Sequence, residues 1–185
     1  MTGAILASVE TTHGPSPVML DADALRARRA ELCALLKDAV QSGASVGYIE
    51  PLQPASLEAF WQRIEADVAN GERHVLATII DDRIVGSVQL ALCMKTNQPH
   101  RADIQKLLVM RGHRGRGIAA TLMRRVEQLA LDLDRWLLIL DTRTDSDADR
   151  LYQAWGWQTI GRVPQYAMDP DGTLADCTFY WKRLR

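Results

Sequence analysis

The chain has 185 residues and a formal net charge of −1, with 22 lysines and arginines against 23 aspartates and glutamates. This length suits one domain with a sizeable core, and the balanced charge gives no reason to expect a nucleic-acid partner. The three cysteines are widely spaced and form no C-x-x-C pair, so we expect no metal site and a reducing compartment. No apolar run reaches membrane-spanning length and no secretory signal opens the chain, so we expect a cytoplasmic protein with no membrane partner.

Glycines and prolines interrupt the first residues, so we expect a loosely ordered segment at 1–16 and a single domain over 17–185. Residues 18–20 form a short candidate strand. Leucines at helical spacing then predict one helix that carries residues 25–40, and a second helix is predicted over 56–68. Helices therefore precede the main strands of the predicted domain.

The rest of the chain alternates between strand and helix patterns. Strands are predicted over 74–80 and 84–94, and the turn Asp81-Asp82 joins them into a hairpin. The strongest helical periodicity lies over 115–133. The other predicted elements are a strand with the run Gln105-Lys106-Leu107-Leu108-Val109, a strand at 136–140, a helix at 145–155, and strands at 157–163 and 178–182 joined by a turn at 169–172. This order predicts an α/β (α+β) fold with one sheet whose N-terminal half is antiparallel.

The most informative motif is the stretch Arg114-Gly115-Arg116-Gly117-Ile118-Ala119, which lies between a predicted strand and the best predicted helix. A glycine-rich turn at a helix N-terminus forms an anion site, because backbone N–H groups converge there and the helix dipole adds partial positive charge. Glycine also lets a phosphate approach the backbone where a Cβ would collide with it. The sequence therefore predicts that a phosphorylated cofactor binds at this loop.

The spacing of the glycines separates the classes of nucleotide loop. A Walker loop requires Lys followed by Ser or Thr after its second glycine, whereas Ile-Ala follows Gly117. The Rossmann pattern G-x-G-x-x-G/A does fit Gly115, Gly117 and Ala120. That pattern normally occurs in the first strand-to-helix turn of a βαβ unit, whereas three predicted strands precede this loop, and Asp141 falls late for the acidic partner. A Rossmann-type oxidoreductase is the alternative from a different class.

The loop also fits the pattern Arg-x-x-Gly-x-Ala, which resembles the R/Q-x-x-G-x-G/A loop that binds the coenzyme A pyrophosphate in the GCN5-related N-acetyltransferase (GNAT) family. Asp145, Ala148, Leu151-Tyr152 and Gly156-Trp157 follow with the spacing of that family's next helix, and the similar region spans roughly residues 72–184. The resemblance implies the GNAT fold, with a mixed and mostly antiparallel central sheet, flanking helices, and a parallel strand pair splayed at the cofactor site. It also implies acetyl-CoA as the co-substrate.

Within this family, residues 43–48, 101–107 and 140–142 resemble the tabtoxin-resistance acetyltransferases. The resemblance implies transfer of an acetyl group to the amine of a small molecule by direct attack in a ternary complex. A toxin-like β-lactam amino acid and an antibiotic-type amine are candidate acceptors. The alternative is a non-enzymatic acyl-CoA-binding module. The sequence leaves the oligomeric state open, with a homodimer as one candidate.

Acetyl transfer from a thioester to an amine needs a neutral amine, hydrogen-bond donors for the oxyanion, and a proton for the leaving thiolate. Tyr152 is the candidate general acid, because a phenol with a pKa near about 10 stays protonated at neutral pH; the alternative is a core tyrosine. Asp103 and Asp141 are the candidate acceptors of the amine proton, and the alternative for each is a strand-end or capping aspartate. If their strands are parallel, the two aspartates lie toward opposite ends of the pair.

Backbone N–H groups of Leu107, Leu108 and Val109 are the candidate oxyanion donors, provided that their strand splays from its neighbour, as a bulge would allow. The expected cofactor-binding residues are Leu107, Leu108, Val109, Arg114, Gly115, Arg116, Gly117, Ile118 and Ala119.

Overall fold

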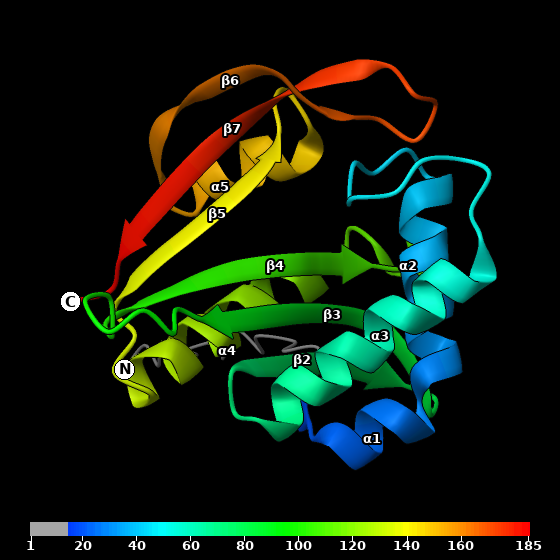
Figure 1. Cartoon of the computed structure of the whole chain (residues 1–185), viewed down its shortest axis with the longest axis horizontal. Coiled ribbons are helices and arrows are strands. Elements are labelled where there is room, and N and C mark those ends of the chain that lie inside the picture. The colour runs from blue at the N-terminus through cyan, green and yellow to red at the C-terminus, as the bar shows by residue number, and fades with distance from the viewer. Residues whose placement is uncertain (1–14) are drawn as a thin grey trace, which may run out of the picture.

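Seven strands form one sheet in the computed structural model, which describes residues 15–185 (Figure 1). The spatial order is β1-β2-β3-β4-β5-β7-β6, and every neighbouring pair is antiparallel except β4 and β5. This mostly antiparallel order excludes the doubly wound parallel sheet of a Rossmann domain. The strands are β1 (Val18–Leu20), β2 (Arg73–Ile80), β3 (Arg83–Leu92), β4 (Arg101–Val109), β5 (Leu137–Arg143), β6 (Gln158–Met168) and β7 (Leu174–Arg183).

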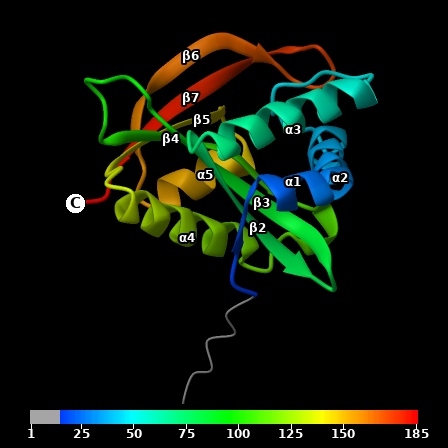
Figure 2. The same ribbon diagram turned by 60° about the horizontal axis from the view of Figure 1, so that its bottom comes forward.

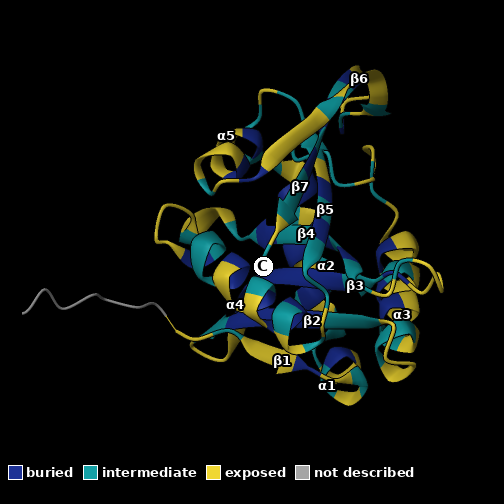
Figure 3. Ribbon diagram, turned by 90° about the vertical axis from the view of Figure 1, so that its left-hand side faces the viewer, coloured by how far each residue is buried: buried dark blue, intermediate teal, exposed yellow. Residues whose placement is uncertain are grey.

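Helices cover both faces of the sheet (Figure 2). The helices α1 (Ala22–Ala27), α2 (Arg29–Gln41) and α3 (Pro54–Ala69) pack on one face, which we call the α3 face. The helices α4 (Ile118–Asp132) and α5 (Asp147–Ala154) pack on the other, which we call the α4 face. Each face has its own hydrophobic core, and Figure 3 shows the buried strands between them. Burial of apolar side chains on both sides supplies the main driving force for this arrangement.

The position of α4 depends on a glycine in the strand beneath it. A Cβ at Gly86 of β3 would lie 3.0 Å from a methyl carbon of Ile118 and 3.2 Å from a methyl carbon of Leu122. The missing side chain therefore allows the first turns of α4 to pack closely on the sheet. Ile118 and Leu122 are both buried, so their contact with Gly86 fixes where the predicted phosphate loop ends and the helix begins.

The parallel pair β4 and β5 is joined over only three residues of each strand. Arg101–Asp103 of β4 pairs with Leu137–Ile139 of β5, and beyond these residues the strands diverge (Figure 1). A β-bulge against β3 accompanies the divergence, where the register shifts opposite Lys106 and this residue adopts a φ of 50°. β5 stays paired with β7 along its whole length. The predicted splay and bulge are therefore both present.

Most predicted elements are confirmed, and one helix is wrong. The helix predicted over 25–40 is broken at Arg28, which separates α1 from α2. The break lets α1 pack against α3 while α2 packs over β3 and β4, so each short helix buries its own leucines. Strands β6 and β7 are also longer than predicted. The turn Asp81-Asp82 is confirmed, with φ values of 50° and 55° that suit a tight hairpin.

The segment predicted to be loosely ordered, 1–16, lies almost wholly outside the described residues. The two residues of this segment that the structure describes, Pro15 and Ser16, belong to no helix or strand, and neither does Pro17. Among residues 15–185, no helix is both long enough and apolar enough to cross a membrane.

Candidate active site

The predicted phosphate loop has the backbone geometry of an anion site. Gly115 and Gly117 have φ values of 74° and 77°, in the left-handed region that favours glycine, and Gly117 is the N-terminal cap of α4. Among residues 15–185, no hydrogen bond uses the backbone N–H groups of 115–120, so these donors are free at the positive end of the helix dipole. A Cβ built on either glycine meets nothing within 4 Å. The loop can therefore accept a pyrophosphate.

The arginines of this region differ in what they contact. The Nε of Arg114 donates to the Val109 carbonyl at 3.0 Å, and its Nη2 donates to Ser42 Oγ at 2.7 Å. Arg111 donates to the Asp38 carboxylate through its backbone N–H and its Nε. Both side chains thus tie the loop to α2 and to the end of β4. Arg116 is exposed and has no partner among the described residues, so it is the side chain of the loop most available to a phosphate.

The strand β4 presents only part of the predicted Leu107–Val109 run to the gap. The backbone N–H of Met110 donates to the Val85 carbonyl of β3. Because successive residues of a strand point their N–H and C=O groups to opposite sides, those of Val109 point away from β3, toward β5. The carbonyl of Leu108 points toward β3, and the Leu108 side chain is buried in the α3-face core. Of this run, Val109 suits an oxyanion or cofactor contact, Leu107 packs partly buried on the α4 face, and Leu108 is a core residue.

Tyr152 lies on α5 and is 6 % exposed, within the core of the α4 face. Its ring packs against Trp155 and Trp157 with centroids 6.0 Å away in both cases. Burial raises the pKa of the Tyr152 hydroxyl above its usual range, and the negative charge of Asp141 raises it further. Among residues 15–185 this hydroxyl makes no hydrogen bond. The phenol therefore stays protonated at neutral pH with its proton free to be donated.

Asp103 and Asp141 lie near one another, contrary to the prediction that they sit at opposite ends of their strands. Asp103 pairs in register with Ile139, and Asp141 is two residues beyond on the same face. That face is the α3 face, because Ala102, Leu138 and their alternate neighbours point into the opposite core. The prediction failed because β4 pairs with β5 only over Arg101–Asp103, so Asp103, the third residue of β4, is already at the point of divergence.

The electrostatics of the two carboxylates differ from those of surface aspartates. Loss of hydration raises the pKa of Asp103, which Arg101 opposes and Asp141 reinforces. Loss of hydration also raises the pKa of Asp141, although its side chain is exposed to the open gap, and Lys106 opposes that rise. One oxygen of Asp103, Oδ1, is buried and has no hydrogen-bond partner among the described residues. An unpartnered carboxylate oxygen beside a second carboxylate suits an incoming ammonium group.

Lys106 belongs to this site and was not among the expected residues. It occupies the bulge of β4, and its ammonium group lies 5.6 Å from the centroid of the Phe60 ring of α3. Loss of hydration lowers its pKa, which Asp141 opposes. The signal in the sequence was a single charge inside an otherwise apolar strand end, but only the bulge turns that charge toward the α3 face, beside Phe60.

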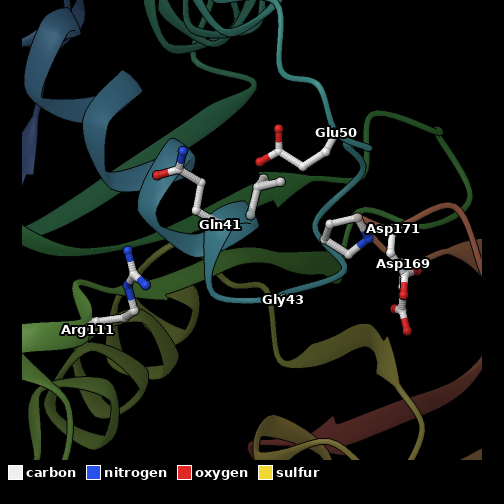
Figure 4. A pocket seen from close by; sticks show the side chains of 8 residues that line it. Gln41, Gly43, Glu50, Arg111, Asp169 and Asp171 are labelled. Carbon is white, nitrogen blue, oxygen red and sulfur yellow. The ribbon is translucent and has the colours of Figure 1, made fainter.

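A pocket of about 660 Å³ lies near the open end of this gap (Figure 4). Gln41 and Gly43 at the end of α2, Arg111, and the turn between β6 and β7 line it. Glu50, Asp169 and Asp171 make one side acidic. Tyr152, Asp103 and Asp141 do not line this pocket, which forms the outer part of the site.

The site at the divergence of β4 and β5 thus has a helix N-terminus with free N–H groups and a protonated phenol on one face, and two carboxylates on the other. This arrangement is the one expected of an acyltransferase that binds a coenzyme A thioester. The model of the Acetyltransferase (GNAT) family matches residues 26–157, and the chain belongs to that family. Membership of this family makes the protein an acetyl-CoA-dependent N-acetyltransferase.

Solved structures share the fold across nearly the whole chain. A ribosomal-protein-alanine N-acetyltransferase from Brucella melitensis is 23% identical with a TM-score of 0.75, over 90% of this chain and 99% of that one. A protein from Salmonella typhimurium, assigned as an acetyltransferase and solved with its cofactor acetyl-CoA, is 19% identical with a TM-score of 0.73, over 92% and 95%. A protein assigned as a phosphinothricin N-acetyltransferase is 16% identical with a TM-score of 0.73, over 92% and 99%.

Replacing Gly117 with valine is expected to weaken acetyl-CoA binding by at least about 10-fold, because the new side chain fills the space that a pyrophosphate would occupy. Titration calorimetry measures the change. A valine at a φ of 77° also strains the backbone, so Gly71→Val is the matched control: its φ is 72°, its surroundings are equally open, and it lies between α3 and β2. Equal affinity in the Gly117 and Gly71 variants would contradict the assignment of the loop.

Proposed function

We propose that this enzyme transfers the acetyl group of acetyl-CoA to the amine of a small molecule by direct attack in a ternary complex. The observation that carries the proposal is the division of the site across the sheet. Tyr152 and the phosphate loop lie on the α4 face, whereas Asp103 and Asp141 lie on the α3 face of the same gap. A thioester that enters from one face and an amine that enters from the other would meet where β4 and β5 part.

Each chemical demand of the reaction has a group in this arrangement. The carboxylates of Asp103 and Asp141 attract the ammonium form of the acceptor, and one of them, directly or through water, takes its proton. The amine nitrogen then attacks the thioester carbon, and the oxygen gains negative charge near the N–H of Val109. The carbon–sulfur bond breaks, the Tyr152 hydroxyl donates a proton to the departing thiolate, and the second proton that the nitrogen loses returns, directly or through water, to the Tyr152 phenolate.

Contacts between loops favour a small acceptor over a protein chain end. Glu50 N–H donates to the Pro170 carbonyl at 2.8 Å, and Ser45 Oγ donates to the Met168 carbonyl at 3.1 Å. The loop after α2 is thereby tied to the turn after β6, which narrows the approach on the α3 face. The acidic side of the outer pocket favours a positively charged acceptor. An antibiotic-type or toxin-type amine fits this description, in line with the name of the phosphinothricin relative.

A cytoplasmic location and a homodimer are further parts of the proposal. The three cysteines are free thiols, which suits a reducing compartment. β6 is the outermost strand of the sheet and is exposed along most of its length (Figure 3), with Ile160, Val163 and Tyr166 among its exposed side chains. An exposed edge strand with apolar side chains suits pairing with a second copy.

A panel of amines tests the acceptor class. The protein is incubated with acetyl-CoA and one amine at a time, with amino acids, aminoglycoside-type and simple alkyl amines, and a peptide that begins with alanine, as the Brucella relative's name suggests. We expect at least one small amine to release free thiol at a rate well above hydrolysis, with the acetylated amine found by mass spectrometry. Thiol release with the peptide alone would contradict the small-molecule acceptor.

The order of events is tested with the same acceptor. Direct attack in a ternary complex predicts intersecting initial-rate lines when both substrates are varied, and no acetylated protein after incubation with acetyl-CoA alone. Parallel lines together with an acetylated side chain would show a covalent intermediate instead.

A further inference from the structure

Lys106 is an unpaired cation in the acceptor side of the site. Among residues 15–185, its ammonium group makes no hydrogen bond and no ion pair. A Cβ built on Gly47, in the loop after α2, would lie 3.9 Å from Lys106 Nζ, and the Phe60 ring is its other close neighbour. The ammonium group therefore ends between β4, α3 and that loop, on the face where Asp103 and Asp141 lie.

The basic side chain next to Lys106 on this face is already engaged. Arg73 Nη1 donates to Gln89 Oε1 and Gln105 Oε1, both at 2.8 Å, and its Nε contacts Asp67 at 3.1 Å. Arg73 is thus held in a network on the α3 face, whereas the head group of Lys106 is not. A lysine that only stabilised the fold would be expected to end on an acceptor or in solvent.

The α3 face of β4 thus carries two complementary groups without a partner among the described residues: the Lys106 ammonium and the buried Oδ1 atom of Asp103, whose other oxygen, Oδ2, lies 3.5 Å from Arg101 Nη2. We propose that Lys106 is a specificity-determining residue that binds a carboxylate carried by the acceptor, while Asp103 and Asp141 bind the acceptor's amine. The inference rests on the proposed function, and it deepens it by assigning a positive and a negative subsite to one ligand. An acceptor with both groups leaves neither subsite unpaired.

The β-bulge in β4 explains how Lys106 can reach a ligand on the α3 face. The bulge turns both Gln105 and Lys106 toward the α3 face, where regular alternation would send one of them into the α4-face core. Phe60 and Gly47 limit hydration around the ammonium group, which makes a charge-assisted hydrogen bond to a ligand stronger than it would be in water. The cation and the carboxylates are carried by the neighbouring strands β4 and β5, so one ligand can reach both.

Differential labelling tests the subsite without turnover. The full-length protein, with acetyl-CoA absent, is reductively methylated in the presence of amine-bearing carboxylates in their N,N-dimethylated forms, since a tertiary amine does not consume the reagent: those of the common α-amino acids, β-alanine and 4-aminobutyrate, with the matched amines also N,N-dimethylated. Each is compared with the amine that lacks the carboxylate, and peptide mass spectrometry follows each lysine. We expect at least one carboxylate-bearing amine to protect Lys106 and its matched amine not to. The exposed residues Lys37 and Lys95 are internal controls that should react equally throughout.

Substitutions test the same subsite in catalysis. Lys106→Met keeps most of the length of the side chain and a Cβ at the unusual φ but removes the charge, whereas Lys106→Arg keeps the charge. With a carboxylate-bearing acceptor, we expect Lys106→Met to raise KM roughly 10- to 100-fold, the scale of a hydrogen bond to a charged group. We expect Lys106→Arg to keep most of the affinity, and Lys106→Met to raise KM for the matched amine much less, because there it acts only through the charge of Asp141.

Two results would overturn the inference. One is that no carboxylate protects Lys106, or that the matched amines protect it equally. The other is that Lys106→Met leaves KM for a carboxylate-bearing acceptor unchanged. Failure of the proposed function gives a different result: carboxylates would still protect Lys106, but no amine in the panel would release thiol.

Discussion

Replacing Tyr152 with phenylalanine is expected to lower kcat about 100-fold or more, the usual scale of proton-transfer catalysis, with acetyl-CoA affinity nearly unchanged. The phenylalanine ring keeps the contacts with Trp155 and Trp157. Because the Tyr152 hydroxyl makes no hydrogen bond to the described residues, its removal leaves no partner unsatisfied. The melting temperature should therefore hardly change. Single-turnover measurements with a working acceptor establish that the loss is in the chemical step.

Tyr180→Phe is the matched control, because Tyr180 is a second buried tyrosine of the same core. Its hydroxyl donates to Asp149 Oδ1 at 2.5 Å and accepts from Gln153 at 2.9 Å. Loss of a buried hydrogen bond to a carboxylate should cost about 1.5–3 kcal/mol of stability, while kcat stays near that of the parent. If Tyr152→Phe instead turned over at the parent rate with chemistry rate-limiting, the hydroxyl would not be the general acid.

Replacing Asp141 with asparagine is expected to lower kcat/KM for the acceptor by roughly 100-fold, within the range of general-base catalysis, without weakening acetyl-CoA binding. Asp103→Asn should act in the same direction, because the two carboxylates share one face of the gap. Their pKa values are both raised, so the parent rate should fall with decreasing pH at higher pH than ordinary aspartates would give. Steady-state kinetics across pH on both variants, with the exposed Asp147→Asn as control, measures these effects.

Stability distinguishes this role from that of a structural aspartate. The raised pKa of Asp141 means that the folded state binds its proton more tightly than the unfolded state. Its ionisation therefore disfavours folding as pH rises to neutrality, and Asp141→Asn should leave the melting temperature unchanged or raise it at neutral pH. An aspartate that anchors the turn at Thr142 would give a lower melting temperature and an unchanged kcat/KM. Unchanged kcat/KM in both the Asp103 and Asp141 variants would contradict their role.

Local patterns predicted the backbone of the glycine-rich loop and its neighbouring elements well. The left-handed glycines of the loop and the hairpin turn at Asp81-Asp82 depend on residues close in sequence, and the structure has both at the predicted place, while α4 begins at Ile118, three residues after its predicted start. The same patterns joined α1 and α2 into one helix, because the leucines keep helical spacing across Arg28. What breaks the helix is packing on different partners, which spacing alone does not contain.

Parts of both the cofactor side and the acceptor side of the site depend on contacts between distant segments. Arg114 carries the phosphate-loop motif, yet its side chain is bound to Val109 and Ser42, and the second contact joins residues 72 positions apart. The nearby Arg116 is exposed and has no hydrogen-bond or ion-pair partner among the described residues, so it, rather than Arg114, is available to a phosphate. Likewise, the outer pocket combines the end of α2, the loop before α4 and the turn after β6, which no single stretch of sequence brings together.

The sequence by itself determined which chemical groups this enzyme carries: a helix terminus for phosphate, a tyrosine, and two aspartates at strand ends. Only the tertiary structure decided how they meet. β5 stays paired with β7 throughout and leaves β4 after Asp103, so the aspartates come together and the bulge turns Lys106 between them and α3. The physical reason is that helix and turn preferences act between near neighbours, whereas strand register and divergence are set by pairing and packing between segments far apart in the chain.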